Sequence, residues 1–333
     1  MLEIDGRHGE GGGQILRTSI ALSALTRTPC MITHIRANRS TPGLRAQHLM
    51  GLKTAAQICN AQTRGLTIGS EAVEFTPGDI TGGRYSVEIG TAGSITLILQ
   101  TLIPICLHAP NPVELLITGG TDVKWSPTSA YFQKVLCSHL ERIGAQVQIT
   151  VEKYGFYPKG GGRLSAIISP WRDKKRVNLT ERGAIAGIEV DSVASSSLKN
   201  PHVAERQASA FQKEFPSYSI NPRIHYGETL NPGSSVCAVA RCEHSVLGAD
   251  SLGERGKPAE TVAEEAARAL QRDLKPGYAL DSHMADQIVP YLALAGGTVT
   301  VTEVTGHTTT NIWVCNQFCE TQVAVDGHVL ETV

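Results

Sequence analysis

The chain of 333 residues lacks an excess of charge of either sign, because 30 lysines and arginines face 31 aspartates and glutamates. Without a net positive charge, a protein can bind nucleic acid only through a local cluster of basic side chains. Long apolar runs are also missing: the longest, residues 95–107, is interrupted by Gln100 and Pro104 and is shorter than the ~20 residues that span a membrane. The sequence therefore excludes a globally basic nucleic-acid binder and predicts no membrane contact.

Cysteine pairs with zinc-site spacing are absent as well. Among the eight cysteines, only Cys237 with Cys242 and Cys315 with Cys319 lie close together in sequence, and neither pair has the C-x2-C spacing. We therefore expect buried free thiols and no structural zinc. Residues 1–5 show neither the basic nor the apolar part of a secretion signal, so we expect a cytoplasmic protein.

Glycine, in contrast, is abundant and punctuates the chain. A glycine-rich turn runs into an apolar helix within 11–22, a small-residue turn does the same within 91–100, and a third turn leads into a strand expected at 164–168. Residues 286–297 predict a further apolar helix, and residues 323–330 predict a hairpin with an Asp-Gly turn. These patterns indicate sheet-plus-helix units that repeat along the chain.

The stretch from about 182 to 276 differs in character. It predicts a strand over 185–193, a helix over 201–215 and a long helix that Thr261 and Glu264 open as a capping box. We expect this stretch to form a small α+β domain of its own.

Three groups of polar residues could carry chemistry. In residues 9–14, a glycine run opens a helix that includes Arg17, an arrangement suited to phosphate, and Glu10 could hold a divalent cation; a simple surface turn is the alternative. Arg36 and Arg39 follow an expected strand at 30–35. Their guanidinium groups could bind phosphate, or the segment could simply be an exposed basic loop.

The third group surrounds His307, in a segment of small and hydroxylic residues that we expect at the end of a strand over 298–304. A lone histidine is more often structural, but an imidazole nitrogen can also act as a covalent nucleophile toward phosphorus.

Eight segments, which span nearly the whole chain and keep the family's motif order, resemble the RNA 3'-terminal phosphate cyclase family. The segments are residues 9–17, 35–39, 42–44, 47–48, 118–122, 155–158, 285–287 and 306–311. The resemblance implies an α/β (α+β) fold in which a large catalytic domain (1–182 and 276–333) consists of repeated βαβαββ-type units like those of enolpyruvyl transferases. A smaller α+β domain (183–275) is inserted into it.

The resemblance also implies an activity. Family members use ATP and a divalent metal, Mg or Mn, to convert an RNA 3'-phosphate end to a 2',3'-cyclic phosphate through enzyme-histidine-AMP and RNA-adenylate intermediates. By motif position, His307 is the adenylated histidine and Glu10 the metal-associated glutamate. The remaining positions implied by the family hold phosphates of ATP or RNA (Arg17, Arg36, Arg39 and Gln47) or form the nucleotide pocket (Gln100, Pro127, His283, Asp286 and Gln287).

Two alternatives belong to other functional classes. Non-catalytic ribosome-assembly factors share the family's fold but lack the nucleophile, whereas His307 is present here. Enolpyruvyl-type transferases share the repeated units but need neither ATP nor a covalent histidine. If the protein forms an oligomer, a symmetric homodimer is the commonest form.

Overall fold

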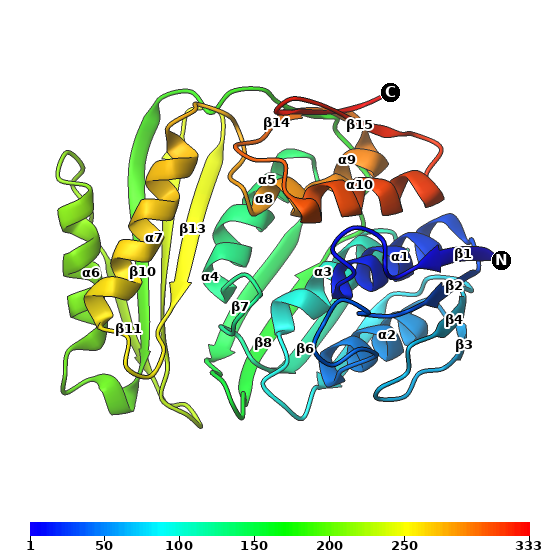
Figure 1. Cartoon of the computed structure of the whole chain (residues 1–333), viewed down its shortest axis with the longest axis horizontal. Coiled ribbons are helices and arrows are strands. Elements are labelled where there is room, and N and C mark those ends of the chain that lie inside the picture. Colours follow the sequence, from blue (N-terminus) through cyan, green and yellow to red (C-terminus); the bar gives the residue numbers. More distant parts are fainter.

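The computed structural model describes residues 1–333 and contains three four-stranded sheets with the same strand order (Figure 1). The first sheet is built from β1 (Leu2–Asp5), β2 (Cys30–Thr33), β3 (Gln62–Arg64) and β4 (Val73–Thr76), and its connections include α1 (Gly13–Thr26) and α2 (Ala46–Ile58). The order is β1-β2-β4-β3, with β1 parallel to β2 and the other neighbours antiparallel.

The second unit repeats this arrangement. Its sheet has the order β5-β6-β8-β7, again with the first pair parallel and the others antiparallel. Its elements are β5 (Gly83–Glu88), α3 (Ile95–Leu107), β6 (Val113–Gly119), α4 (Ser129–Tyr131), a π-helical segment (Phe132–Leu136), α5 (Cys137–Arg142), β7 (Val147–Lys153) and β8 (Gly162–Ile168).

The third unit has the same strand order, β9-β14-β16-β15, with β9 parallel to β14. Its elements are β9 (Val177–Leu179), α8 (Met284–Gln287), α9 (Val289–Ala295), β14 (Gly297–Thr300), α10 (Gly306–Phe318), β15 (Val323–Asp326) and β16 (Val329–Thr332). Three βαβαββ units thus confirm the predicted fold class. One apolar core runs through all three, and α1 packs against α2, α3 and α10 inside it.

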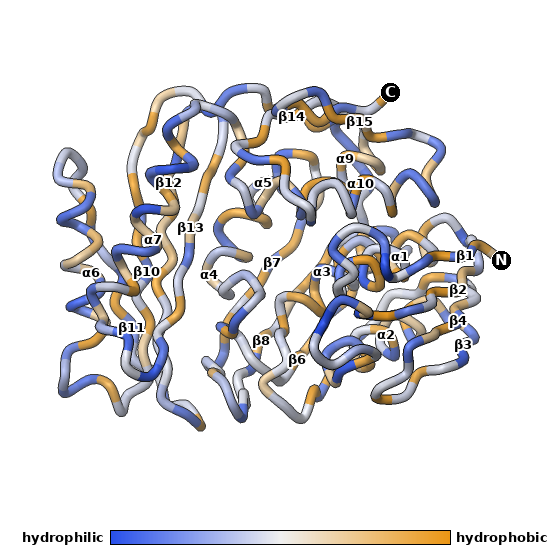
Figure 2. Tube along the Cα trace, in the orientation of Figure 1, coloured by the Kyte–Doolittle hydropathy of each residue, from blue (hydrophilic) through white to orange (hydrophobic).

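A fourth sheet lies between β9 and α8 in sequence and forms the left part of Figure 1. Its order is β11-β10-β12-β13, and α6 and α7 pack against it over a second apolar core. The elements are β10 (Ile185–Ser195), α6 (Val203–Glu214), β11 (Arg223–Gly227), β12 (Ser234–Cys242), β13 (Val246–Leu252) and α7 (Ala259–Leu274). Figure 2 shows apolar and hydrophilic segments alternating along α7, as in an amphipathic helix with one buried face. The domain boundaries at 183 and 275 stay a prediction that this separate sheet and core support.

Three local expectations are wrong. Helix α7 begins at Ala259, directly after Pro258, so Thr261 lies inside the helix and caps nothing; proline is well suited to a helix start because its φ is already helical. The apolar stretch from 286 forms two short helices, α8 and α9, that meet at Ile288. His307 lies in the first turn of α10 and not at a strand end, because Thr305 makes a capping box with Thr308 that starts the helix there.

The cysteines match the expectation of free thiols. All eight are free, and every one except the half-buried Cys319 is buried. None of the helices is both long and apolar enough to cross a membrane.

Candidate active site

A basic side chain from the segment after β2 lies against the loop between β1 and α1, at the start of that helix. Gly9 and Gly11 have φ values of 53° and 55°, a left-handed backbone that glycine adopts without steric cost. A Cβ atom on Gly12 would lie 2.8 Å from Nη2 of Arg39, so that guanidinium rests directly on the loop. Gly12 caps α1 without a side-chain hydrogen bond, which leaves the first N–H groups of the helix available to an anion.

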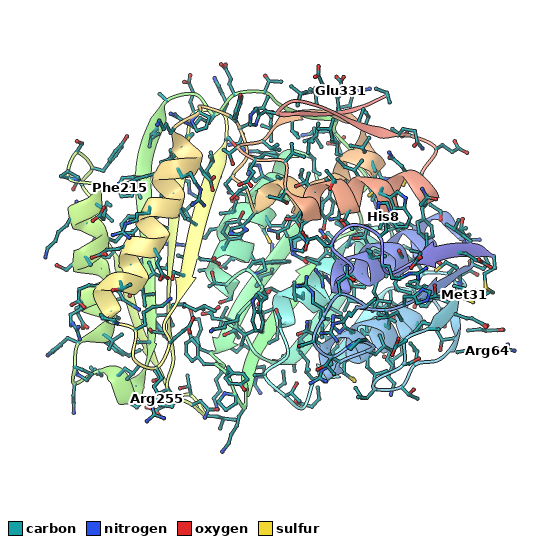
Figure 3. The ribbon with its side chains drawn as sticks, viewed as in Figure 1. His8, Met31, Arg64, Phe215, Arg255 and Glu331 are labelled. Carbon is teal, nitrogen blue, oxygen red and sulfur yellow. The ribbon has the colours of Figure 1, made fainter.

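Contacts with α10 hold this loop in place. The ring of His8, labelled in Figure 3, stacks on Trp313 with 3.9 Å between ring centroids. The backbone N–H of Glu10 donates to Oγ1 of Thr310 at 3.3 Å. A Cβ on Gly306 would lie 2.4 Å from Oε1 of Glu10. The Glu10 carboxylate therefore lies against the first turn of α10, next to the segment that carries His307.

The His307 side chain reaches the surface at this place, and its Nδ1 lies 2.9 Å from Oε1 of Gln14. Partial burial lowers the pKa of His307, and the positive charges of Arg17 and Arg39 lower it further, whereas Glu10 acts in the opposite direction. The ring is therefore largely neutral at neutral pH, which is the state that an attacking imidazole needs.

Three predicted phosphate-binding arginines, Arg17, Arg36 and Arg39, form no ion pair with a carboxylate. Arg36 donates only to carbonyl groups of its own loop, those of Thr41 (2.6 Å) and Gly43 (2.9 Å). Burial lowers the pKa of Arg17 to about 10; the nearby Asp286 carboxylate acts in the opposite direction, and Arg39 lowers the pKa further. Burial and the nearby Arg45 and Arg39 lower the pKa of Arg36. A partly buried guanidinium without a salt-bridge partner is costly in a folded protein, so an anion bound there would be stabilising.

His48 completes this group, although sequence reasoning gave it no role. The backbone N–H of Arg45 donates to its Nδ1 at 3.3 Å, so the proton of the neutral ring is on Nε2. A Cβ on Gly13 would lie 2.4 Å from that nitrogen. Burial and the nearby arginines lower the pKa of His48 to about 3. We call Arg17, Arg36, Arg39 and His48 the anion site. In the sequence, His48 directly follows Gln47 next to an arginine-rich loop, and this position could have indicated its role.

A cavity next to the anion site collects most of the predicted nucleotide-binding residues. Gln100, Asp286 and Gln287 line it together with Arg17 and Gln14, so α1, α3 and α8 all contribute. Nε2 of Gln100 donates to Oε1 of Gln287 at 3.0 Å. Burial raises the pKa of Asp286 to about 6, so its carboxyl group is still mainly ionised at neutral pH.

The other predicted residues lie around this cavity. Gln47 lines a second, smaller cavity that it shares with Arg17 and His48, and its Oε1 accepts from the N–H of Ser94 at 2.8 Å. His283 is exposed and directly precedes α8. Pro127 lines neither cavity; its carbonyl accepts from Oγ1 of Thr96 at 2.9 Å, and its role in nucleotide binding stays a prediction.

Glu10 fits the role of a protein ligand to a divalent metal ion whose other ligands come from bound phosphate groups and water. No group of three His, Cys, Asp or Glu side chains could hold an ion by itself. Mg²⁺, however, is commonly held by one or two carboxylates together with substrate phosphates. Glu10, beside a site built for anions, offers one such carboxylate.

Comparisons with known proteins identify the family of the chain. The family model described as RTC, RNA 3'-terminal phosphate cyclase, matches residues 8–325. A protein of Pyrococcus abyssi named RNA 3'-terminal phosphate cyclase is 45% identical over 331 residues, which cover 99% of this chain and 96% of the relative. The protein of the same name from Methanosarcina barkeri is 46% identical over 329 residues, covering 98% and 97%. The chain therefore belongs to the RNA 3'-terminal phosphate cyclase family of enzymes.

Proposed function

We propose that this protein converts an RNA 3'-terminal phosphate to a 2',3'-cyclic phosphate at the expense of ATP, through a histidine-AMP and an RNA-adenylate intermediate. The observation that carries the proposal is a neutral histidine, His307, within the field of Arg17 and Arg39, neither of which forms a salt bridge. Arg36 adds a third positive charge beside Arg39. Such a site supplies both a nucleophile for phosphorus and positive charge for several phosphates.

In the first step, a ring nitrogen of His307 attacks the α-phosphorus of ATP. The bond from that phosphorus to the bridging oxygen breaks, and pyrophosphate leaves with the electron pair. The protein then carries AMP on His307. Positive charge from Arg17 and Arg39 reduces the repulsion among the phosphates and stabilises the leaving group.

In the second step, an oxygen of the RNA 3'-phosphate attacks the phosphorus of the bound AMP and releases His307. The terminal phosphate, which has only poor leaving groups, now carries AMP as a good one. The neighbouring ribose 2'-OH attacks the RNA phosphorus, loses its proton and expels AMP, which closes the five-membered ring. Because this attack is intramolecular, correct orientation supplies much of its rate.

The remaining residues receive binding roles in this proposal. Arg36 and Gln47 bind phosphates of ATP or of the RNA end, and the nucleoside lies among Gln100, Pro127, His283, Asp286 and Gln287. Glu10 would hold Mg²⁺ or Mn²⁺, which when bound neutralises phosphate charge. Since the chain has no net positive charge, we expect it to contact only the last nucleotides of RNA, with a shallow salt dependence of binding.

The test uses ATP labelled at the α-phosphate. We expect an acid-labile, alkali-stable AMP adduct on the native protein in the presence of Mg²⁺ or Mn²⁺, and none on His307→Ala. His225→Ala, an exchange of an exposed histidine in the region of the fourth sheet, serves as the matched control and should retain full labelling. An unlabelled native protein would instead favour a non-catalytic binding protein, and turnover of phosphoenolpyruvate would favour an enolpyruvyl-type transferase.

Two further points belong to this proposal. Eight free cysteines, seven of them buried, support a cytoplasmic enzyme, since disulfides are rare in that reducing compartment. A symmetric homodimer stays a prediction, which light scattering on the eluting protein would test.

A further inference from the structure

The side chain of Gln14, a residue without a role so far, lies between His307 and Asp286. Its Oε1 is 2.9 Å from Nδ1 of His307, and its Nε2 donates to Oδ2 of Asp286 at 2.7 Å. Gln14 is only 5% exposed and is the second residue of α1, whereas its two partners lie in α10 and α8. The three side chains therefore form a chain of hydrogen bonds that links three separate elements.

The direction of these hydrogen bonds follows from the chemistry of the three groups. An ionised carboxylate can only accept, so the amide NH₂ of Gln14 must face Asp286. The amide oxygen then faces His307, and because this oxygen can only accept, Nδ1 of His307 must carry a proton. A neutral imidazole has one proton, so its lone pair is left on Nε2.

The backbone that holds this arrangement is itself fastened by buried side chains. Oγ1 of Thr18 donates to Oδ1 of Asn311 at 2.7 Å, and Nδ2 of Asn311 donates to the carbonyl of Asp286 at 2.8 Å. These bonds join α1, α10 and α8 one helical turn away from the histidine. Gln14 consequently has a fixed position relative to both of its partners.

We infer that Gln14, oriented by Asp286, is a positioning residue that holds His307 in the tautomer with Nδ1 protonated and Nε2 free to attack. The inference rests on the proposed function for its catalytic meaning. When Nε2 bonds to the α-phosphorus and pyrophosphate leaves, Nδ1 keeps its proton and the ring becomes cationic. Its hydrogen bond to Gln14 then strengthens, because a charged donor binds an acceptor more tightly than a neutral one.

The first experiment measures the tautomer without any ATP. In full-length protein labelled with ¹⁵N-histidine, long-range ¹H–¹⁵N spectra at pH 7.5 distinguish a protonated ring nitrogen from one with a lone pair, and His307→Ala identifies the signals of this residue among the eleven histidines. We expect a protonated Nδ1 and a lone pair on Nε2. A proton on Nε2 in the wild-type protein would overturn the inference.

The second experiment changes the hydrogen-bond chain. Gln14→Met has a similar shape but cannot accept, so we expect loss of the single tautomer and a decrease of about 10- to 100-fold in the rate of adduct formation, the range found for comparable supporting residues. In the double variant Gln14→Glu with Asp286→Asn, an amide donates to a carboxylate that still accepts from Nδ1. We expect this variant to restore the tautomer and part of the rate.

Controls separate this inference from the proposed function. Gln133→Met, an exchange at an exposed helical position outside the site, should change neither readout. If wild-type protein forms no adduct, the proposed function fails while the tautomer measurement stands. If Gln14→Met keeps both the tautomer and a wild-type labelling rate, the inference fails while the proposed function stands.

Discussion

Replacing Gly12 by alanine tests whether the position of the Arg39 guanidinium matters for the reaction. The new Cβ would lie 2.8 Å from Nη2 of Arg39. Ordinary contacts between such atoms are about 3.5 Å, so the guanidinium must retreat by about 0.7 Å. Gly12 has a φ of −102°, which alanine adopts without strain, so the displacement is the main local effect.

The expected loss of rate follows from how strongly catalysis depends on the position of a charged group. A displacement of about 1 Å at a catalytic site can cost about 100-fold in rate, so we expect Gly12→Ala to slow adduct formation about 10- to 100-fold. Stability should change little: alanine is a poorer N-cap than glycine, which costs α1 about 0.5–1 kcal/mol.

The assay is single-turnover labelling with α-labelled ATP, alongside urea unfolding of the same preparations. Gly187→Ala is the matched control, because a Cβ at this position of β10 meets nothing within 4 Å and the backbone is not left-handed. Wild-type labelling by a well-folded Gly12→Ala protein would refute the argument that this guanidinium binds phosphate in the reaction.

Three other predictions address the metal, acid stability and the fourth sheet. Glu10→Gln should raise the Mg²⁺ concentration needed for half-maximal labelling at least about tenfold, because an amide is a weaker ligand for a hard cation; an unchanged requirement would contradict the role of Glu10. His139 is fully buried, and burial lowers its pKa to about 4, so the folded protein binds fewer protons than the unfolded chain below pH 6.5 and loses stability as the pH falls from 6.5 towards 4. The free energy of unfolding of the native protein should therefore fall between pH 7 and pH 4 by up to about 3 kcal/mol more than that of His139→Gln. If both proteins show the same pH dependence, His139 does not contribute to acid instability. Phe211→Ala removes a fully buried ring that stacks on Phe215 at 5.0 Å and should lower the free energy of unfolding by about 3–5 kcal/mol in urea titrations, whereas a loss below about 1 kcal/mol would show that this core is not packed as described.

Much of the local structure could be predicted from the sequence because local patterns encode it. The small-residue turn at 91–94 leads into the apolar helix α3, as the pattern within 91–100 predicted, and the Asp-Gly turn joins β15 to β16. Helix starts were less predictable, since several residues compete for the cap: Pro258 displaces Thr261 as the entry to α7, and Thr305 begins α10 where a strand end was expected.

The sequence by itself determined which chemical groups are present: the glycine loop, the arginines and a histidine in a hydroxyl-rich segment, in an order typical of one family. Only the tertiary structure decided which of them meet. Gln14 contacts His307 across 293 positions of sequence, and Asp286 reaches Gln14 across 272. Packing buries His48 and places it near Arg17, Arg36 and Arg45, and both effects lower its pKa. Side-chain patterns specify individual helices and strands, but contacts among α1, α8 and α10 arise when three units bury a shared core, and no local pattern contains that information.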